Sequence, residues 1–132
     1  GYATGHFGKW GEGWLPDAVP YRRGYDQAAL VGGYAHRDPI LNVNGTGIPH
    51  TGWTTDILVD HTLRFIAAHR GRPWCATTAF IAMHSPWVCD AKFSKPYLDA
   101  GHSPALAACY GLLSQMDDSL GRLLRGLHDL GE

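Results

Sequence analysis

Lys9 and His84 are the two side chains whose surroundings suggest chemistry on a bound anion. Lys9 lies in a glycine-rich segment, 5–13, directly after an expected strand over 2–7. Glycines let the backbone approach a ligand closely, and a lysine on such a turn can act as a point charge for an anion. His84 follows ten residues without a charge, 74–83, and imidazole can hold a proton near neutral pH. Taken by themselves, both residues are also explained by simpler roles, a solvated loop lysine and a histidine that caps a strand end.

The other reactive groups do not form a recognisable site. The three cysteines are odd in number and have no Cys-x-x-Cys spacing, so they predict neither a disulfide framework nor a zinc knuckle. They are Cys75, Cys89 and Cys109. His36, Arg37 and His50 are spread over one irregular region without the close pairing typical of metal ligands. No metal ligands are therefore assigned within this sequence.

Composition limits the class of protein. The 132 residues are 45% hydrophobic and carry a net charge of -1, which is typical of one globular domain with a core. Acids and bases are mixed along the chain, so no basic stripe indicates a nucleic-acid partner. No signal peptide or membrane-spanning run occurs in the sequence, and a membrane partner is not expected. The opening Gly1-Tyr-Ala-Thr-Gly5 has the character of the inside of a domain.

The apolar run 74–83 predicts a strand that is buried on both faces of a parallel sheet, because its apolarity is continuous rather than alternating. Pro73 and Pro86 bound the run. Ligands of open α/β sheets bind just outside the carboxyl ends of the strands. His84 is therefore expected at a ligand-binding edge.

A long irregular region, 14–53, is rich in glycine and proline and is predicted to be mostly loop. Within it, Asn44-Gly45 is a type I′ turn signal, and 40–43 could be one arm of a hairpin.

A helix is predicted over 55–70, with Thr54 or Thr55 as the N-cap and Gly71 just after its end. His61 falls beside the apolar face of this helix and is predicted to be a packed core residue. The order of helix, short loop and buried strand is one half of a βαβ unit and indicates an α/β fold.

A polar loop is predicted over 90–102, followed by a long helix over 104–130 that Ser103 caps and Gly131 ends. Apolar residues recur along this helix at a spacing that predicts a buried stripe lying on a sheet. They are Leu106, Cys109, Tyr110, Leu113, Met116, Leu120, Leu123, Leu124, Leu127 and Leu130. Three glycines inside the helix indicate close packing there, namely Gly111, Gly121 and Gly126. Asp117 and Asp118 are predicted to be its solvated side rather than a catalytic pair.

Several stretches, in the correct order, resemble the sulfatases, which belong to the alkaline-phosphatase-like superfamily. Residues 1–13 resemble the signature GYxTxxxGKWHLG, and 21–26 resemble the RGFD segment that follows it. The helix start 54–60 is similar to TTDxLTD, and 79–86 is similar to the strand that ends in HxP. The long helix of the family is similar to 110–131. The resemblance implies an arylsulfatase-like three-layer α/β/α fold with a mixed, mainly parallel sheet, of which residues 1–132 would be a central segment.

The resemblance also implies roles for four residues. Lys9 matches the lysine that contacts the sulfate and the formylglycine nucleophile, and His84 matches the histidine that binds sulfate and protonates the leaving alcohol. A fixed cation and a proton donor near the leaving oxygen suit the cleavage of a sulfate ester. Trp10 and Trp87 flank these positions and are expected to wall the pocket. The substrate would be a small-molecule or carbohydrate sulfate ester.

The sequence departs from the family pattern in three ways. Gly11 stands where the signature has a histidine that helps to release sulfate. The nucleophile motif C/S-x-P/A-x-R is absent, and so are the two carboxylate pairs that hold calcium, a cation that prefers oxygen ligands. We therefore expect an internal piece of a sulfatase that is inactive alone and completed by the rest of its own catalytic domain, which supplies the formylglycine and the calcium ligands.

Two alternatives remain open from the sequence. One is a phosphodiesterase or phosphonate hydrolase of the same fold, and the other is a non-catalytic sulfatase-like binding domain. Sulfatases are commonly secreted, periplasmic or lysosomal, but no compartment is predicted for this chain.

Overall fold

The computed structural model describes residues 1–13 and 15–132. Its elements are, in order, β1 (Ala3–Gly8), the 3-10 helix η1 (Pro20–Arg22), β2 (Gln27–Val31), β3 (Ile40–Val43), β4 (Thr46–Pro49), α1 (Thr54–Ala68), β5 (Trp74–Ala79), α2 (Ala91–Asp99) and α3 (Pro104–Leu130). None of the described helices is both long enough and apolar enough to span a membrane.

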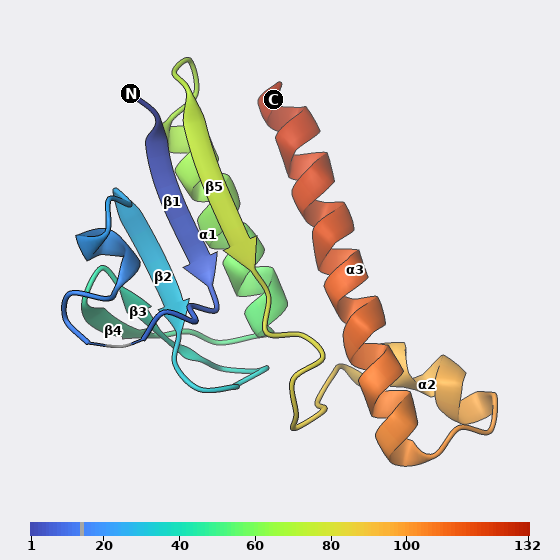
Figure 1. The fold of residues 1–132 in the computed structure, drawn as a ribbon. Helices are drawn as coiled ribbons and strands as arrows, with labels where there is room; N and C mark the ends of the chain where they lie inside the picture. Colours follow the sequence, from blue (N-terminus) through green and yellow to red (C-terminus); the bar gives the residue numbers. More distant parts are fainter. Residues whose placement is uncertain (14) are drawn as a thin grey trace.

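The strands form one mixed sheet in the order β4-β3-β2-β1-β5. Strand β1 pairs in parallel with β2 on one side and with β5 on the other. Strand β3 pairs antiparallel with β2 and with β4. The three parallel strands therefore point their carboxyl ends to the same edge of the sheet (Figure 1). This arrangement confirms the predicted α/β class with a mixed sheet.

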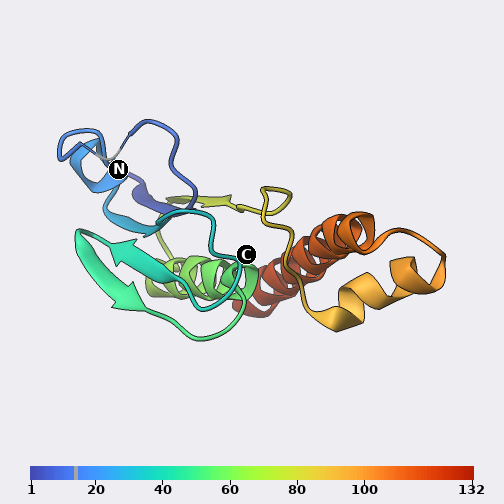
Figure 2. The same cartoon turned by 90° about the horizontal axis from the view of Figure 1, so that it is seen from below.

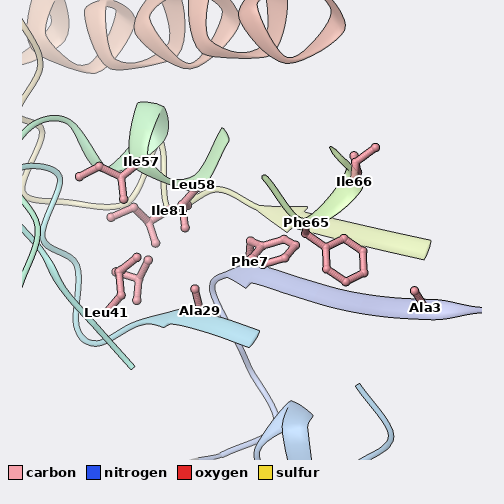
Figure 3. Packing of buried hydrophobic residues seen from close by; sticks show 10 residues of the cluster. Ala3, Phe7, Ala29, Leu41, Ile57, Leu58, Phe65, Ile66 and Ile81 are labelled. Atoms are coloured by element: carbon pink, nitrogen blue, oxygen red, sulfur yellow. The ribbon is translucent and has the colours of Figure 1, made fainter. Parts of the chain in front are cut away.

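Alternation along β2 sends its side chains to two different cores, and Ala3 and Phe7 of β1 belong to the larger one. Phe7 lies between β1 and helix α1, where its ring centroid is 5.6 Å from that of Phe65 (Figure 3). The residues of this main core come from the strands, α1 and the segment after β5, and they are Ala3, Phe7, Ala29, Val31, Leu41, Ile57, Leu58, Phe65, Ile66 and Ile81. On the opposite face, Ala28 and Leu30 pack under Val19, which directly precedes η1.

Helices α1 and α3 lie on one side of the sheet, and the segment around η1 lies on the other (Figure 2). Arg122 joins the two helices: its guanidinium donates to an Asp60 carboxylate oxygen at 2.6 Å and to the Asp56 carbonyl oxygen. Ser119 also donates to the Asp56 carboxylate at 2.9 Å. These residues lie in stretches that resemble sulfatase motifs, and their contacts here are structural.

Several local predictions are confirmed. Val43 pairs with Thr46, so Asn44 and Gly45 form a two-residue hairpin turn, and both have positive φ angles, 48° and 98°. The Ser103 side chain caps α3, and Gly131 ends it in the left-handed conformation. His61 is buried, and Asp117 and Asp118 are exposed.

The predicted close packing of α3 is found at two of its three glycines. A Cβ at Gly111 would lie 2.8 Å from the Ser94 backbone nitrogen of α2, and one at Gly126 would lie 2.5 Å from a Leu63 methyl carbon of α1. At Gly121 the nearest atom belongs to the flexible Arg125 side chain.

The prediction of a strand over 74–83 that is buried on both faces is wrong. Strand β5 ends at Ala79, and its Cys75 and Thr77 side chains are exposed. Only the face with Trp74 and Ala76 packs against the main core. In the described residues, β5 is the last strand of the sheet, and no strand pairs with its outer edge.

Three further expectations are corrected. The region 14–53 is not one long loop, because β2, β3 and β4 lie within it. The segment 90–102 contains helix α2, which Asp90 caps by accepting a hydrogen bond from the Lys92 nitrogen at 3.0 Å. Helix α1 begins after Trp53 rather than after a threonine cap, and it ends at Ala68, with His69 as its C-cap, rather than at Arg70 beside Gly71.

Much of the apolar stripe predicted to be buried on α3 faces solvent. The exposed members are Leu106, Tyr110, Leu113, Leu120 and Leu124, and we call them the leucine face. Of the predicted stripe, Cys109 is buried. The buried residues of the helix are mostly small or polar, with Leu112 as the one large apolar side chain, and they are Ala107, Cys109, Gly111, Leu112, Gln115 and Ser119. In Figure 1, α3 lies beyond the outer edge of β5, the last strand of the described sheet.

Because of this exposed surface, we expect the isolated 132-residue chain to unfold without cooperativity or to aggregate. It should bind a hydrophobic dye, and the double substitution Leu113→Lys/Leu124→Lys should reduce that binding. The control Leu98→Lys, on α2, should leave dye binding nearly unchanged, since Leu98 is exposed but is not part of the leucine face. A sharp thermal transition of a dye-free monomer in circular dichroism would contradict the prediction.

His61 has an unusual environment. Its ring stacks on Phe7 at a centroid distance of 6.3 Å, and its Nε2 lies 3.0 Å from Nε2 of His50. Burial, aided by the positive charges of Arg64 and His50, lowers the pKa of His61 from 6.5 to about 4. In the folded protein, His61 is therefore neutral above about pH 4.

We predict that His61 makes the fold less stable in acid. The unfolded chain takes up a proton near pH 6.5 and the folded chain only near pH 4. Stability is therefore lost as the pH falls through this window, by on the order of 3 kcal/mol in all. The measurement is an NMR titration of the protein with labelled histidines, in which His61→Gln identifies the signal. A midpoint near 6.5 for that signal would overturn the prediction.

Candidate functional site

The carboxyl ends of the three parallel strands define the candidate site. Strand β1 ends at Gly8, β2 at Val31 and β5 at Ala79, and the loops that follow all leave from this one edge (Figure 1). Strand β1 lies between the other two, so the chain departs to both sides of it. Such an edge is where ligands of open α/β sheets bind.

Gly8 brings Lys9 to this edge. The Lys9 backbone nitrogen donates to the Ala79 carbonyl oxygen at 2.8 Å, so the chain turns across the end of β5 as it leaves β1. Gly8 has a φ of 120°, and a Cβ there would lie 1.9 Å from the same oxygen. Only glycine fits both conditions.

His6 holds the other side of this turn. Its ring is buried, and Nε2 lies 2.9 Å from the Lys9 carbonyl oxygen. A carbonyl oxygen only accepts, so Nε2 carries the hydrogen. The ring also meets Trp10 and Tyr25 edge-on, at centroid distances of 5.0 and 5.6 Å. Because its backbone is bonded on both sides, Lys9 projects from a fixed turn while its side chain remains exposed.

Trp10 lies beside Lys9, where its indole nitrogen donates to the Ala18 carbonyl oxygen at 2.9 Å. A hollow of about 150 Å³ opens here, and its lining residues are Lys9, Trp10, Val31, Gly33 and Tyr34. The predicted pocket wall therefore lies next to the predicted cation. Contact of Trp10 with a ligand stays a prediction.

His84 lies five residues beyond the end of β5, in the loop that leaves the same edge. Its Nδ1 is 2.6 Å from the Ser85 carbonyl oxygen, so Nδ1 carries a hydrogen. Its own carbonyl oxygen accepts from Nε2 of the buried His36 at 2.8 Å. The nitrogen Nε2 of His84 is then the ring atom left to face a ligand.

Tyr34 joins the two predicted residues. Its ring stacks on His84 with a centroid distance of 3.4 Å and an interplanar angle of 3°. The Lys9 ammonium lies 5.9 Å from the centroid of the same ring. The structure thus brings Lys9 and His84, which are 75 positions apart in the sequence, to the ring of one aromatic residue.

Trp87 is placed differently. It lies on the loop after His84, is exposed, and donates from its indole nitrogen to the Met83 carbonyl oxygen at 3.2 Å. It is not among the described residues that line the hollow beside Lys9. Trp10 and Trp87 therefore do not form one continuous wall in the described part of the chain.

Sequence reasoning missed His6, Tyr34 and His36. The pair Gly32-Gly33 marks the end of β2 and hence a loop at the ligand edge. No spacing connects position 34 or 36 with position 84, because the contacts form only when the strands assemble side by side. From the sequence, His36 is only a histidine in a predicted loop, without a second metal ligand at close spacing.

Asp26, in the stretch that resembles the RGFD segment, connects the starts of β1 and β2. One carboxylate oxygen accepts from the Thr4 backbone nitrogen at 2.8 Å and from the Thr4 hydroxyl at 3.1 Å. The backbone hydrogen bond from Thr4, followed by the hydroxyl bond, lowers the pKa of Asp26. This residue aligns the parallel pair rather than acting on a ligand.

The described residues offer no metal centre, and Cys89 is not an activated thiol. No group of three or more His, Cys, Asp or Glu side chains gathers among them in a way that could hold a metal ion. The residues present thus do not fit a calcium site. Burial raises the pKa of the Cys89 thiol, the opposite of what a nucleophilic cysteine needs.

Comparison with known proteins gives one family and a set of similar folds. The sequence model of the family described as Sulfatase matches residues 1–132. The solved structure of Ps i-CgsB in complex with k-i-k-neocarrahexaose is 21% identical, with a TM-score of 0.88 over 98% of this chain and 34% of that chain. BT4656 in complex with its substrate, D-glucosamine-2-N,6-O-disulfate, is 17% identical, with a TM-score of 0.69 over 100% and 45%. The PsFucS1 sulfatase from Pseudoalteromonas sp. is 18% identical, with a TM-score of 0.73 over 99% and 33%.

No curated protein matches the sequence. The identities to the solved structures are low, and the likeness shows a shared fold. The chain spans between about a third and just under half of the length of those three proteins. Because the family model covers every residue, and because the sheet and its helices superpose on these larger proteins, the chain belongs to the sulfatase family.

Proposed function

We propose that this chain is a segment of a sulfuric ester hydrolase, in which Lys9 and His84 bind the sulfate group and His84 protonates the leaving alcohol. The observation that carries the proposal is the meeting of Lys9 and His84 at the ring of Tyr34, on the carboxyl edge of three parallel strands. Ligand position in α/β sheets and the chemistry of the two side chains both support it.

The proton transfer follows from the hydrogen bonds of His84. As an imidazolium it carries a second hydrogen on Nε2, which can pass to the ester oxygen as the S–O bond breaks. The product is the neutral ring with its hydrogen on Nδ1. The Ser85 carbonyl oxygen, 2.6 Å away, accepts from that nitrogen before and after the transfer. The ring therefore needs no reorientation to act as a general acid.

Lys9 supplies fixed positive charge. A sulfate ester carries negative charge on its non-bridging oxygens, and more develops on the bridging oxygen as the bond breaks. The exposed ammonium group can reach these oxygens from a turn whose backbone is hydrogen-bonded on both sides of Lys9. Trp10, and Trp87 from its separate loop, would limit access of water to the bound ester.

The remaining machinery is assigned to other segments of the full-length protein. We assign the nucleophile, a formylglycine, and the calcium ligands to segments outside residues 1–132, because this sequence has no matching nucleophile motif and the described residues gather no metal-binding cluster. A formylglycine in the rest of the domain would supply the nucleophile for the sulfur atom of the ester. The rest of the catalytic domain is thus the partner of this chain, and the isolated chain has no turnover.

A sulfated carbohydrate is the substrate class that the comparisons favour. Two of the similar structures hold a carrahexaose and a disulfated glucosamine. The non-catalytic alternative has one observation in its favour, namely Gly11 at the position of the signature histidine. A Cβ at Gly11 would meet nothing within 4 Å, so the position has room for a side chain that this chain does not use.

The roles of Lys9 and His84 are tested by Lys9→Ala and His84→Ala in the full-length protein. Each should lower kcat/KM for a sulfate ester by about 10²–10³-fold, because each removes a group that stabilises charge in the transition state. The controls are Lys92→Ala and His102→Ala, on and just after α2, which should stay within about twofold of wild type.

An aryl phosphodiester, assayed in parallel, separates sulfatase from phosphodiesterase activity. Greater wild-type activity on the phosphodiester would favour the latter. If both alanine variants hydrolyse the sulfate ester within about threefold of wild type, the assigned roles are wrong.

The turn that carries Lys9 gives a further test. Gly8→Ala should lower activity by at least about 10²-fold, because the new methyl group must displace the Ala79 carbonyl and move Lys9 with it. Gly11→Ala is the matched control in the same turn, since its Cβ meets nothing within 4 Å, and it should keep activity within about twofold. Circular dichroism shows whether Gly8→Ala remains folded. Equal activity of the two variants would contradict the assigned role of the turn.

A further inference from the structure

We propose that Tyr34 is a positioning residue for His84: it orients the imidazole and stabilises the positive charge that the ring carries as an acid. The inference rests on the proposed role of His84. Tyr34 lies in the loop between β2 and β3.

This loop is fixed to the start of helix α1. The Thr54 backbone nitrogen donates to the His36 carbonyl oxygen at 2.9 Å, and the Thr54 hydroxyl donates to the Ala35 carbonyl oxygen at 2.6 Å. Further along, the Asp38 and Gly52 backbones are bonded to each other, at 2.8 Å from the Asp38 nitrogen to the Gly52 oxygen. A loop with this many anchors can present a side chain at a set position.

Two contacts run from the loop to His84. His36, which is 5% exposed, donates from Nε2 to the His84 carbonyl oxygen and so fixes the backbone of that residue. The Tyr34 ring then lies flat on the imidazole at 3.4 Å, which leaves the ring little freedom to rotate. The backbone and the side chain of His84 are thus held by residues two positions apart.

The aromatic face also suits the charge. A cation over the face of tyrosine is attracted by the ring quadrupole. His84 as an imidazolium and the Lys9 ammonium both lie near this ring, the latter at 5.9 Å. The attraction offsets the repulsion between two cations that must be close together to hold one sulfate group. The contact becomes stronger as the site loses water around a bound ester.

Core packing does not account for this residue. The Tyr34 side chain is 46% exposed and belongs to neither buried cluster of the described residues. It lines the hollow beside Lys9. A large aromatic residue at the surface, stacked on a candidate acid, points to a role in the site.

The test uses the full-length protein and two aryl sulfates, a nitrophenyl ester with a good leaving group and a methoxyphenyl ester with a poor one. A good leaving group needs little protonation, so loss of acid function affects mainly the poor one. Tyr34→Leu should lower kcat about tenfold for the methoxyphenyl ester and no more than about twofold for the nitrophenyl ester. Tyr34→Phe, which keeps the aromatic face, should stay within about twofold for both, and so should the remote control Tyr2→Leu.

A spectroscopic measurement tests the stack without turnover. In protein with labelled histidines, the ring protons of His84 should carry an upfield ring-current shift that Tyr34→Leu removes and Tyr34→Phe keeps. An unchanged His84 spectrum in Tyr34→Leu would overturn the proposal, and so would an equal loss of kcat for both esters. The His84→Ala variant separates this outcome from failure of the proposed function. If His84 is not the acid, His84→Ala retains activity on both esters.

Discussion

The close approach of two strands at Gly8 is the constraint on which the site depends. Residue 8 must leave β1 with a positive φ while its backbone lies against the Ala79 carbonyl, and no side chain fits between them. This contact sets where Lys9 begins and where the loop from β5 starts. The parallel register of β1 with β2 then adds the third loop at the same edge. Local backbone geometry thus determines the meeting of three distant segments.

Two buried histidines extend this constraint in the same manner. His6 donates to the carbonyl oxygen of Lys9, and His36 donates to the carbonyl oxygen of His84. In each case the supporting ring holds the backbone of the functional residue rather than its side chain. Backbone support of this kind fixes the origin of a side chain without using any of the hydrogen-bonding groups that chemistry requires.

Motifs and local signals predicted more of this molecule than burial patterns did. Turn and cap signals located the 44–45 hairpin and both ends of α3, because those depend on a few adjacent residues. The apolar run at 74–83 and the stripe on α3 were both assigned to the wrong surroundings. Periodicity reports which face is apolar, but what covers that face depends on segments elsewhere in the chain.

Strand β2, with its short QAALV sequence, gave no clear signal because alanine is uninformative there. Tyr34 could not be assigned to the site, since its contact partner is 50 positions away.

The anchoring of the β2–β3 loop has a consequence for how such a site can diversify. The bonds from Thr54 are accepted by the backbone carbonyls of Ala35 and His36, and the bond between Asp38 and Gly52 at 2.8 Å is likewise formed by backbone atoms. The side chains of Ala35 and Arg37 are exposed between these fixed points. Substitution at either position can therefore alter the exposed surface of the loop that carries Tyr34 without breaking these backbone bonds. Because backbone bonds hold the loop path and the exposed side chains do not, such changes carry little risk to the position of His84.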